Sequence, residues 1–335
     1  MVAGGWLGWW VGGCPVTARP NLTPLGRYLD PLLIRRLEAL KLRRRTARLG
    51  SGGGSHAGLM RGPGVEFRQH RFYTRGDDPR HIDWKLLART ARAHVREYDH
   101  ETNLRCVLML DASGSMNYGE VDENKFDFAR RLCAALAYVL LSQQEAVGLE
   151  IVGSRAAVYV PPAQGQAQLP VVIEALDRVA PASRADFKSA AMLATSSLSR
   201  RSMVVVVSDF LQHVDEIGQT VAALRHQKHD VVLASIRHDD EGRFPFSGYL
   251  KLIGLEDEAE KNGRASDLAV VYRQRLAAHE KGLSRVAQRH ACHLWRFVTN
   301  RDLATQLAAA MCGELRTDDA GGPFAGMEGG RHDRR

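Results

Sequence analysis

The sequence predicts an α/β protein built on a doubly wound, mostly parallel sheet. Apolar runs, such as residues 106–110, 203–207 and 231–236, alternate along the chain with amphipathic helical patterns. An apolar run without polar alternation is typical of a strand buried on both faces, as the strands of a parallel sheet are. The segments between these runs are long enough for the crossover helices that parallel neighbours require.

Length and composition indicate a globular protein with a core of its own. The 335 residues are 44% hydrophobic and 25% charged, which is ordinary for a soluble chain. The net charge of +8 comes from the N-terminal third. A solvated basic face explains this excess more simply than a nucleic acid, a membrane surface or an acidic partner. The five cysteines show neither zinc spacing nor a disulfide framework, which favours a reducing cytoplasm.

We expect four segments along the chain. Residues 1–28 are apolar and glycine-rich, lack the basic start of a signal peptide, and are predicted to be a disordered start. Residues 29–102 hold a basic helix at 31–48, a Gly/Ser linker and a charged, irregular module. Residues 103–312 form the sheet domain, and the glycine-rich, charged residues 313–335 are predicted to be a disordered tail.

The elements of the sheet domain are predicted from apolar periodicity. Strands are unbroken apolar runs, helices carry an apolar residue every three or four positions, and Pro161 is expected to end one strand. The predicted strands are 105–110, 147–152, 156–160, 203–207, 230–236, 249–253 and 292–297, and the predicted helices are 123–143, 169–179, 187–198, 215–227, 267–288 and 302–311. Upstream, a short helix is predicted at 84–94 and an extended piece at 94–101.

The stretch "RGDDPRHIDW", residues 75–84, combines turn chemistry with dense charge. Its charged side chains are predicted to pair and fold the segment, and its tryptophan is predicted to anchor it to the sheet domain. A docking surface is the functional alternative, since Arg and Trp are enriched at protein interfaces. The residues concerned are Arg75, Asp77, Asp78, Arg80, Asp83 and Trp84.

Polar side chains follow two of the predicted central strands. Asp111 comes directly after residues 105–110, with Ser113 and Ser115 at alternate positions beyond it, and Asp209 follows 203–207. In a doubly wound sheet the carboxyl ends of the central strands meet beside the topological switch point, where ligands bind. We therefore expect these side chains to converge.

Several chemistries of such a site are disfavoured. Ser113 lacks the flanking glycines of the Gly-x-Ser-x-Gly nucleophile elbow, and neither glycine-rich phosphate-binding motif follows the strand. An aspartyl-phosphate enzyme would need an acid/base Asp where Ser113 stands. A magnesium-dependent, phosphatase-like hydrolase working through Asp111 nevertheless remains the enzyme alternative.

Binding of a hard metal ion would account for Asp111, Ser113 and Ser115 together. One carboxylate and two hydroxyls supply oxygen ligands that suit Mg²⁺ or Mn²⁺, and Gly114 permits the tight turn between the serines. The simpler explanation, a helix N-cap, requires only one of these residues.

The pattern Asp111-x-Ser113-x-Ser115 after a buried strand resembles the metal-ion-dependent adhesion site of von Willebrand factor A domains. The resemblance implies that both serines bind the ion directly, while Asp111 and Asp209 act directly or through water. Ala185 stands where that family has a ligating threonine, so the resemblance implies a weakened site.

The upstream motif "RFYTRGDDPRHIDWKLLAR", followed by "LMLDASGSM", resembles the bacterial domain-of-unknown-function family 58 from Leu29 to Met311. The resemblance implies a non-enzymatic adaptor that works with a MoxR-type AAA+ ATPase in the chaperone-like assembly or maturation of a client protein. We expect a cytoplasmic chain without an integral membrane span and without a nucleic-acid partner. Peripheral membrane contact stays open.

Overall fold

The structure is a computed structural model. It describes residues 24–38, 66–74, 82–90, 92–99, 104–120, 124–154, 158–182, 187, 202–252 and 261–312. The predicted Gly/Ser linker, most of the predicted helix at 187–198 and the predicted tail at 313–335 lie outside these ranges.

A sheet with the strand order β10-β7-β6-β3-β4-β5 forms the centre of the molecule. Neighbouring strands are parallel except for β4 and β5, which are antiparallel. The chain leaves β3 toward β4 on one side and later returns beside β3 as β6, so the topological switch lies between β3 and β6. This confirms the predicted doubly wound, mostly parallel sheet. Its strands are β3 (Arg105–Asp111), β4 (Ala146–Val152), β5 (Val158–Ala163), β6 (Met203–Ser208), β7 (Asp230–Arg237) and β10 (His293–Val298).

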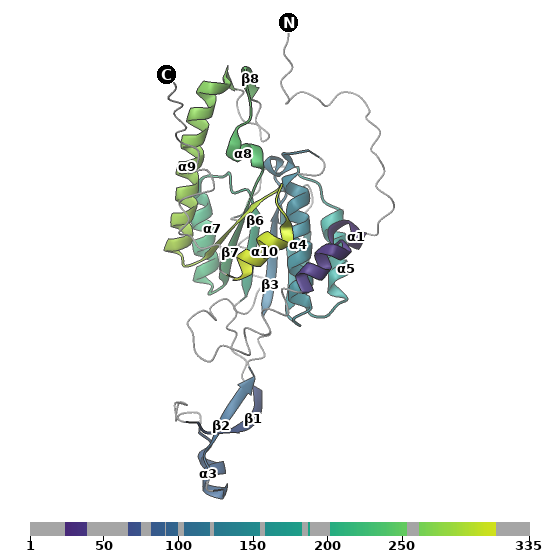
Figure 1. Cartoon of the computed structure of the whole chain (residues 1–335), viewed down its shortest axis with the longest axis vertical. Coiled ribbons are helices and arrows are strands. Elements are labelled where there is room, and N and C mark those ends of the chain that lie inside the picture. The colour runs from purple at the N-terminus through teal and green to yellow at the C-terminus, as the bar shows by residue number, and fades with distance from the viewer. Residues whose placement is uncertain are drawn as a thin grey trace, which may run out of the picture.

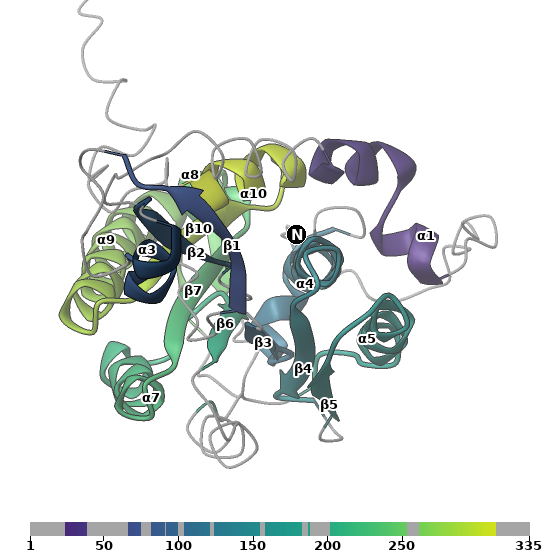
Figure 2. The same ribbon diagram turned by 90° about the horizontal axis from the view of Figure 1, so that it is seen from below.

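Helices cover both faces of this sheet (Figures 1 and 2). One face carries α4 (Lys125–Leu141), α5 (Gln168–Asp177) and α10 (Leu303–Cys312). The other face carries α7 (Val214–His226) and α9 (Ala265–Arg289). Among the described helices, none is both long and apolar enough to cross a bilayer.

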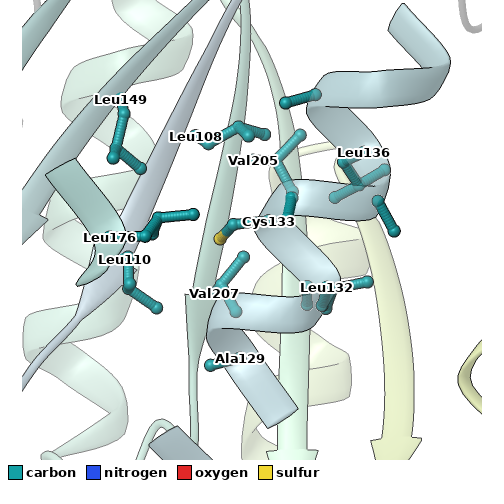
Figure 3. Close-up of a cluster of buried hydrophobic side chains, with 14 of the residues drawn as sticks. Leu108, Leu110, Ala129, Leu132, Cys133, Leu136, Leu149, Leu176, Val205 and Val207 are labelled. Carbon is teal, nitrogen blue, oxygen red and sulfur yellow. The ribbon is translucent and has the colours of Figure 1, made fainter. Parts of the chain in front are cut away.

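The largest core lies between α4 and the sheet. Alternate residues of each strand point to opposite faces, so Leu108 and Leu110 of β3 face α4 while Val107 and Met109 face α7 and α9. Figure 3 shows these leucines and the β6 valines around the α4 side chains that fill the layer, which are Ala129, Leu132, Cys133 and Leu136. Asn124 caps α4, because its side chain accepts from the backbone N–H groups of Phe126 at 2.8 Å and Asp127 at 3.3 Å.

Residues 24–38 pack on the sheet domain, which corrects the predicted boundaries. The short helix α1 (Pro24–Tyr28) falls inside the segment predicted to be disordered, and Tyr28 is buried and donates to Asp177 at 2.9 Å. Leu33 and Leu37, in the helical residues 31–38, join the same core as α4. Because these apolar side chains belong to that core, the boundary predicted at residue 103 does not separate two cores.

The module predicted to be irregular contains a β-hairpin. Strands β1 (Glu66–Phe72) and β2 (His94–Asp99) pair antiparallel, and α3 (Trp84–Thr90) lies between them in sequence. The predicted helix and extended piece are confirmed there. In Figure 1 the hairpin and α3 stand away from the large sheet. The prediction of an irregular module was wrong because β1, the pairing partner of the extended piece, is mostly charged and polar, and its two phenylalanines do not form an alternating apolar pattern.

Two predicted strands are present, but one differs from the prediction at its end and the other lies in a separate ribbon. The strand predicted at 156–160 continues through Pro161 and Pro162, since β5 is an edge strand and edge positions tolerate a missing N–H. The strand predicted at 249–253 lies outside the large sheet. As β8 (Tyr249–Leu252) it pairs only with β9 (Lys261–Arg264), in a separate two-stranded ribbon.

Candidate functional site

Polar side chains gather where β3 and β6 end, beside the switch point. Asp111 is the last residue of β3, and Asp209 follows the last residue of β6. The start of α4 and the short helix α8 (Asp239–Arg243), which follows β7, complete the group. We call it the strand-end cluster, and its members are Asp111, Ser113, Ser115, Lys125, Ser208, Asp209 and Glu241.

Asp111 is fully buried, and both of its carboxylate oxygens accept hydrogen bonds. The backbone N–H of Ser113 donates to Oδ1 at 2.8 Å, and the Ser208 hydroxyl donates to Oδ2 at 2.5 Å. Burial, and next the nearby charge of Asp209, raise the pKa of Asp111 to about 7 although the serine bonds oppose this. The carboxylate is thus held in one orientation, in surroundings that favour a neighbouring positive charge.

Ser113 and Ser115 lie beside this carboxylate with their hydroxyl oxygens 3.1 Å apart. Ser113 precedes the 3₁₀ turn η2 (Gly114–Asn117), but its side chain makes no capping hydrogen bond. The N-cap explanation therefore does not describe Ser113. One carboxylate and two hydroxyls converge within a single turn, as the spacing predicts.

Lys125 is a member of the cluster that the sequence analysis missed. Its side chain is only 1% exposed, and its ammonium donates to Asp209 Oδ2 at 2.7 Å and to Glu241 Oε1 at 2.9 Å. Burial alone would lower the pKa of Lys125, but the two carboxylates outweigh burial and hold it above its usual value. A signal was present, because a lysine at the first position of a helix opposes the helix dipole and needs a local anion.

Asp209 is engaged on both oxygens as well. Oδ2 accepts from Lys125, and Oδ1 accepts from the backbone N–H of Leu211 at 3.3 Å. Between them Phe210 adopts a left-handed backbone with φ of 54°, and its carbonyl oxygen lies 2.7 Å from a ring nitrogen of His279. The structure thus brings Asp209 near Asp111, as predicted, but pairs it with an internal cation.

Glu241 connects the cluster to α8. Its Oε2 accepts from the backbone N–H of His238 at 2.8 Å, while the His238 ring accepts from the Asp240 N–H at 3.2 Å. These two bonds form a capping box at the start of α8. Because Oε1 of the same carboxylate binds Lys125, the position of α8 depends on the cluster.

The donor chemistry fits a hard divalent ion in part. Asp111, Ser113 and Ser115 offer oxygen ligands, and the three carboxylates of the cluster outnumber the ammonium that contacts two of them. In the described part of the chain no group of three or more His, Cys, Asp or Glu side chains is arranged to hold a metal. Any ion here would therefore depend on serine oxygens. Ala185, at the expected threonine position, lies outside the described residues.

The predicted docking residues are partly described. Asp83 Oδ1 accepts from the backbone N–H groups of Lys85 at 3.0 Å and Leu86 at 3.1 Å, so Asp83 caps α3. Trp84 is 63% exposed, and the prediction that it anchors the module to the sheet domain was wrong, because it starts a helix with no buried residue. The other predicted docking residues lie outside the described ranges and are Arg75, Asp77, Asp78 and Arg80.

The strand order and the strand-end cluster together define the class. The chain is a von Willebrand factor A-like α/β protein with an oxygen-rich cluster at the carboxyl edge of its sheet. It belongs to the family described as protein of unknown function DUF58, whose model matches residues 69–281.

Several known proteins are similar to this chain. An uncharacterized protein of Mycobacterium tuberculosis is 26% identical over 313 residues, covering 92% of this chain and 98% of the relative. The crystal structure of the conserved hypothetical protein BatB from Bacteroides thetaiotaomicron matches with a TM-score of 0.40 and 15% identity, over 62% of this chain and 96% of BatB. The SpRpn10 VWA domain matches with a TM-score of 0.38 and 11% identity, over 61% of this chain and 93% of that domain.

Proposed function

We propose that this chain is a non-enzymatic adaptor of the cytoplasm whose strand-end cluster holds Mg²⁺ or Mn²⁺ and uses it to grip an acidic side chain of a partner protein. The observation that carries the proposal is the convergence of Asp111, Ser113 and Ser115 at the carboxyl end of β3. Asp209, as the fourth residue of the site, acts from the neighbouring strand end.

The ligand set explains why such an ion would bind a partner. Magnesium usually keeps several waters and takes few protein ligands. An ion held mainly by Asp111 and two serines therefore retains exchangeable positions, and a carboxylate from another protein can replace a water there. The excess of carboxylates over ammonium in the cluster favours a cation at this place.

We assign the partner as a MoxR-type AAA+ ATPase, with a client protein whose assembly or maturation the pair assists. The resemblance of residues 29–311 to domain-of-unknown-function family 58 supports this assignment. A second contact surface is available on the charged module, where Trp84, Lys85 and Arg89 are all exposed. Tryptophan and arginine are enriched among the residues that contribute most to binding at protein interfaces.

A pull-down with the full chain tests the proposal. The chain is used as bait in native lysate with Mg²⁺ and again with a chelator, and bound proteins are identified by mass spectrometry. We expect an AAA+ ATPase with Mg²⁺, its loss with the chelator or with Asp111→Ala, and its retention with Glu174→Ala, a change on the exposed side of α5. If no AAA+ ATPase is captured under either condition, the proposal is wrong.

The same preparations test the hydrolase alternative. An adaptor releases no phosphate from generic phosphate esters with Mg²⁺ present. Turnover that Asp111→Asn abolishes and Glu174→Ala preserves would replace the adaptor by a magnesium-dependent hydrolase.

A further inference from the structure

The carboxylate of Asp209 lies close to both Asp111 and the ammonium of Lys125. Asp209 directly follows Ser208, whose hydroxyl donates to Asp111 Oδ2 at 2.5 Å, so its carboxylate lies beside the proposed ion site. At the same time its Oδ2 accepts a 2.7 Å hydrogen bond from Lys125. A divalent ion beside Asp111 and the ammonium of Lys125 would therefore compete for the same carboxylate.

We infer that Lys125 sets the ligand number and the affinity of the strand-end cluster for a divalent ion, because its ammonium keeps Asp209 out of the direct ligands. The ion is then held by Asp111, Ser113 and Ser115, and Asp209 acts only through space or through water. This inference rests on the proposed metal site and names the residue that regulates it.

Several contacts fix the position of Lys125. Its backbone N–H donates to the Tyr118 carbonyl at 3.0 Å, and the Asn124 cap fixes the first turn of α4. Its ammonium also donates to Glu241. Moving the side chain toward solvent would leave two poorly exposed carboxylates unpaired, which is strongly unfavourable.

A direct bond from Asp209 to the ion would meet a second obstacle. An ion on either oxygen of Asp209 would stand close to the ammonium already bound to Oδ2, and the two cations would repel in a poorly hydrated site. The other oxygen, Oδ1, also accepts from the Leu211 N–H. The ion therefore gains less by taking Asp209 than it would in a cluster without a lysine.

The expected consequence is a weak, exchangeable ion with open positions. In oxygen-ligand sites the number of charged ligands is a main determinant of affinity. With Asp209 withheld, a carboxylate from the partner protein supplies the missing negative ligand, so that ion and partner bind together.

Binding of Mn²⁺ alone to the full chain tests the inference, with free Mn²⁺ measured by electron paramagnetic resonance. We expect Asp111→Asn to weaken binding by about tenfold or more, because it removes a direct charged ligand. Asp209→Asn in the native background should change the dissociation constant by less than about threefold, since Asp209 is not a direct ligand. The Asp209→Asn chain keeps the Lys125 pair with Glu241 and should fold.

Removing the ammonium should reverse the importance of Asp209. We expect Lys125→Met to tighten Mn²⁺ binding by about tenfold, because it frees one carboxylate for the ion. Adding Asp209→Asn to Lys125→Met should cancel that gain. Lys125→Arg, the matched control, keeps a cation in place and should not tighten binding. Circular dichroism and thermal unfolding verify the fold of each variant.

The results of these titrations distinguish a failure of the inference about Lys125 from a failure of the proposed metal site. If Asp209→Asn alone weakens Mn²⁺ binding as much as Asp111→Asn, or if folded Lys125→Met shows no gain, the inference is wrong while the metal site stands. If no variant binds Mn²⁺ and the native chain does not either, the metal site and the inference both fall. Should Lys125→Met not fold, the comparison of Asp209→Asn with Asp111→Asn in the native background decides alone.

Discussion

Glu150 should make the stability of this protein fall as the pH rises through the acid range. It lies on β4, where its Cα pairs with Met109 of β3 and with Tyr159 of β5, and its side chain is only 6% exposed. Its Oε2 atom is buried and has no hydrogen-bond partner among the residues that the structure describes. Burial alone raises the pKa of this carboxyl from 4.5 to about 7.

The direction of this change in stability with pH follows from proton binding. Between pH 4.5 and about 7 the folded chain holds the Glu150 proton while the unfolded chain has released it. The free energy of unfolding therefore decreases as the pH rises through this window, and the decrease is complete above it. Since one pKa unit corresponds to about 1.4 kcal/mol, the loss attributable to Glu150 is about 3.5 kcal/mol at most.

Glu150→Gln keeps the shape of the side chain and removes the titration. We expect the stability difference between this variant and the native chain to be near zero at pH 4.5 and to grow to about 2–3 kcal/mol in favour of the variant at pH 8. Urea unfolding at a series of pH values measures it, with Glu174→Gln on exposed α5 surface as the matched control. A difference that does not change with pH, or a variant less stable than the native chain at pH 8, would refute the reasoning.

Three further predictions concern packing, capping and docking. Leu132→Ala removes a fully buried side chain between α4 and the sheet and should cost about 2–5 kcal/mol in urea unfolding, whereas a cost below about 1 kcal/mol would mean that the core collapses into the cavity. Asn124→Ala removes the cap of α4 and should cost about 1 kcal/mol, with Asn124→Asp as the variant that keeps the stability. Trp84→Ala should leave the thermal midpoint unchanged, because the ring is exposed, but should reduce recovery of the ATPase in the pull-down. An unchanged recovery would show that Trp84 is not part of the docking surface.

The sheet was predictable because its signal is local. Runs such as residues 203–207 can be buried only as central strands, and the helices between them show clear apolar periodicity. Of the ribbon of β8 and β9, only β8 was predicted. The other strand, β9, was missed because Lys261–Arg264 carries no apolar residue. Its pairing depends on neighbours that no local pattern reveals.

The part of the site that lies on one local segment was also predictable from the sequence, whereas the contacts from distant segments were not. Asp111, Ser113 and Ser115 lie within one turn, so their spacing alone predicts that they converge. Lys125 and Glu241 reach the cluster from α4 and α8, and their contacts join residues separated by 84 and 116 positions along the chain. A lysine at the first position of a helix indicates a nearby anion but does not identify it.

The two prolines of β5 restrict how a partner can bind this protein. Pro161 and Pro162 lack a backbone N–H, and they occupy the outermost strand on one side of the sheet. Successive residues of a strand direct their N–H groups to opposite sides, so one of the two prolines removes a donor from the open edge, where an extended peptide would need it. Recruitment by β-augmentation is therefore disfavoured at this point of the border, and the same feature disfavours edge-to-edge joining of copies of this chain.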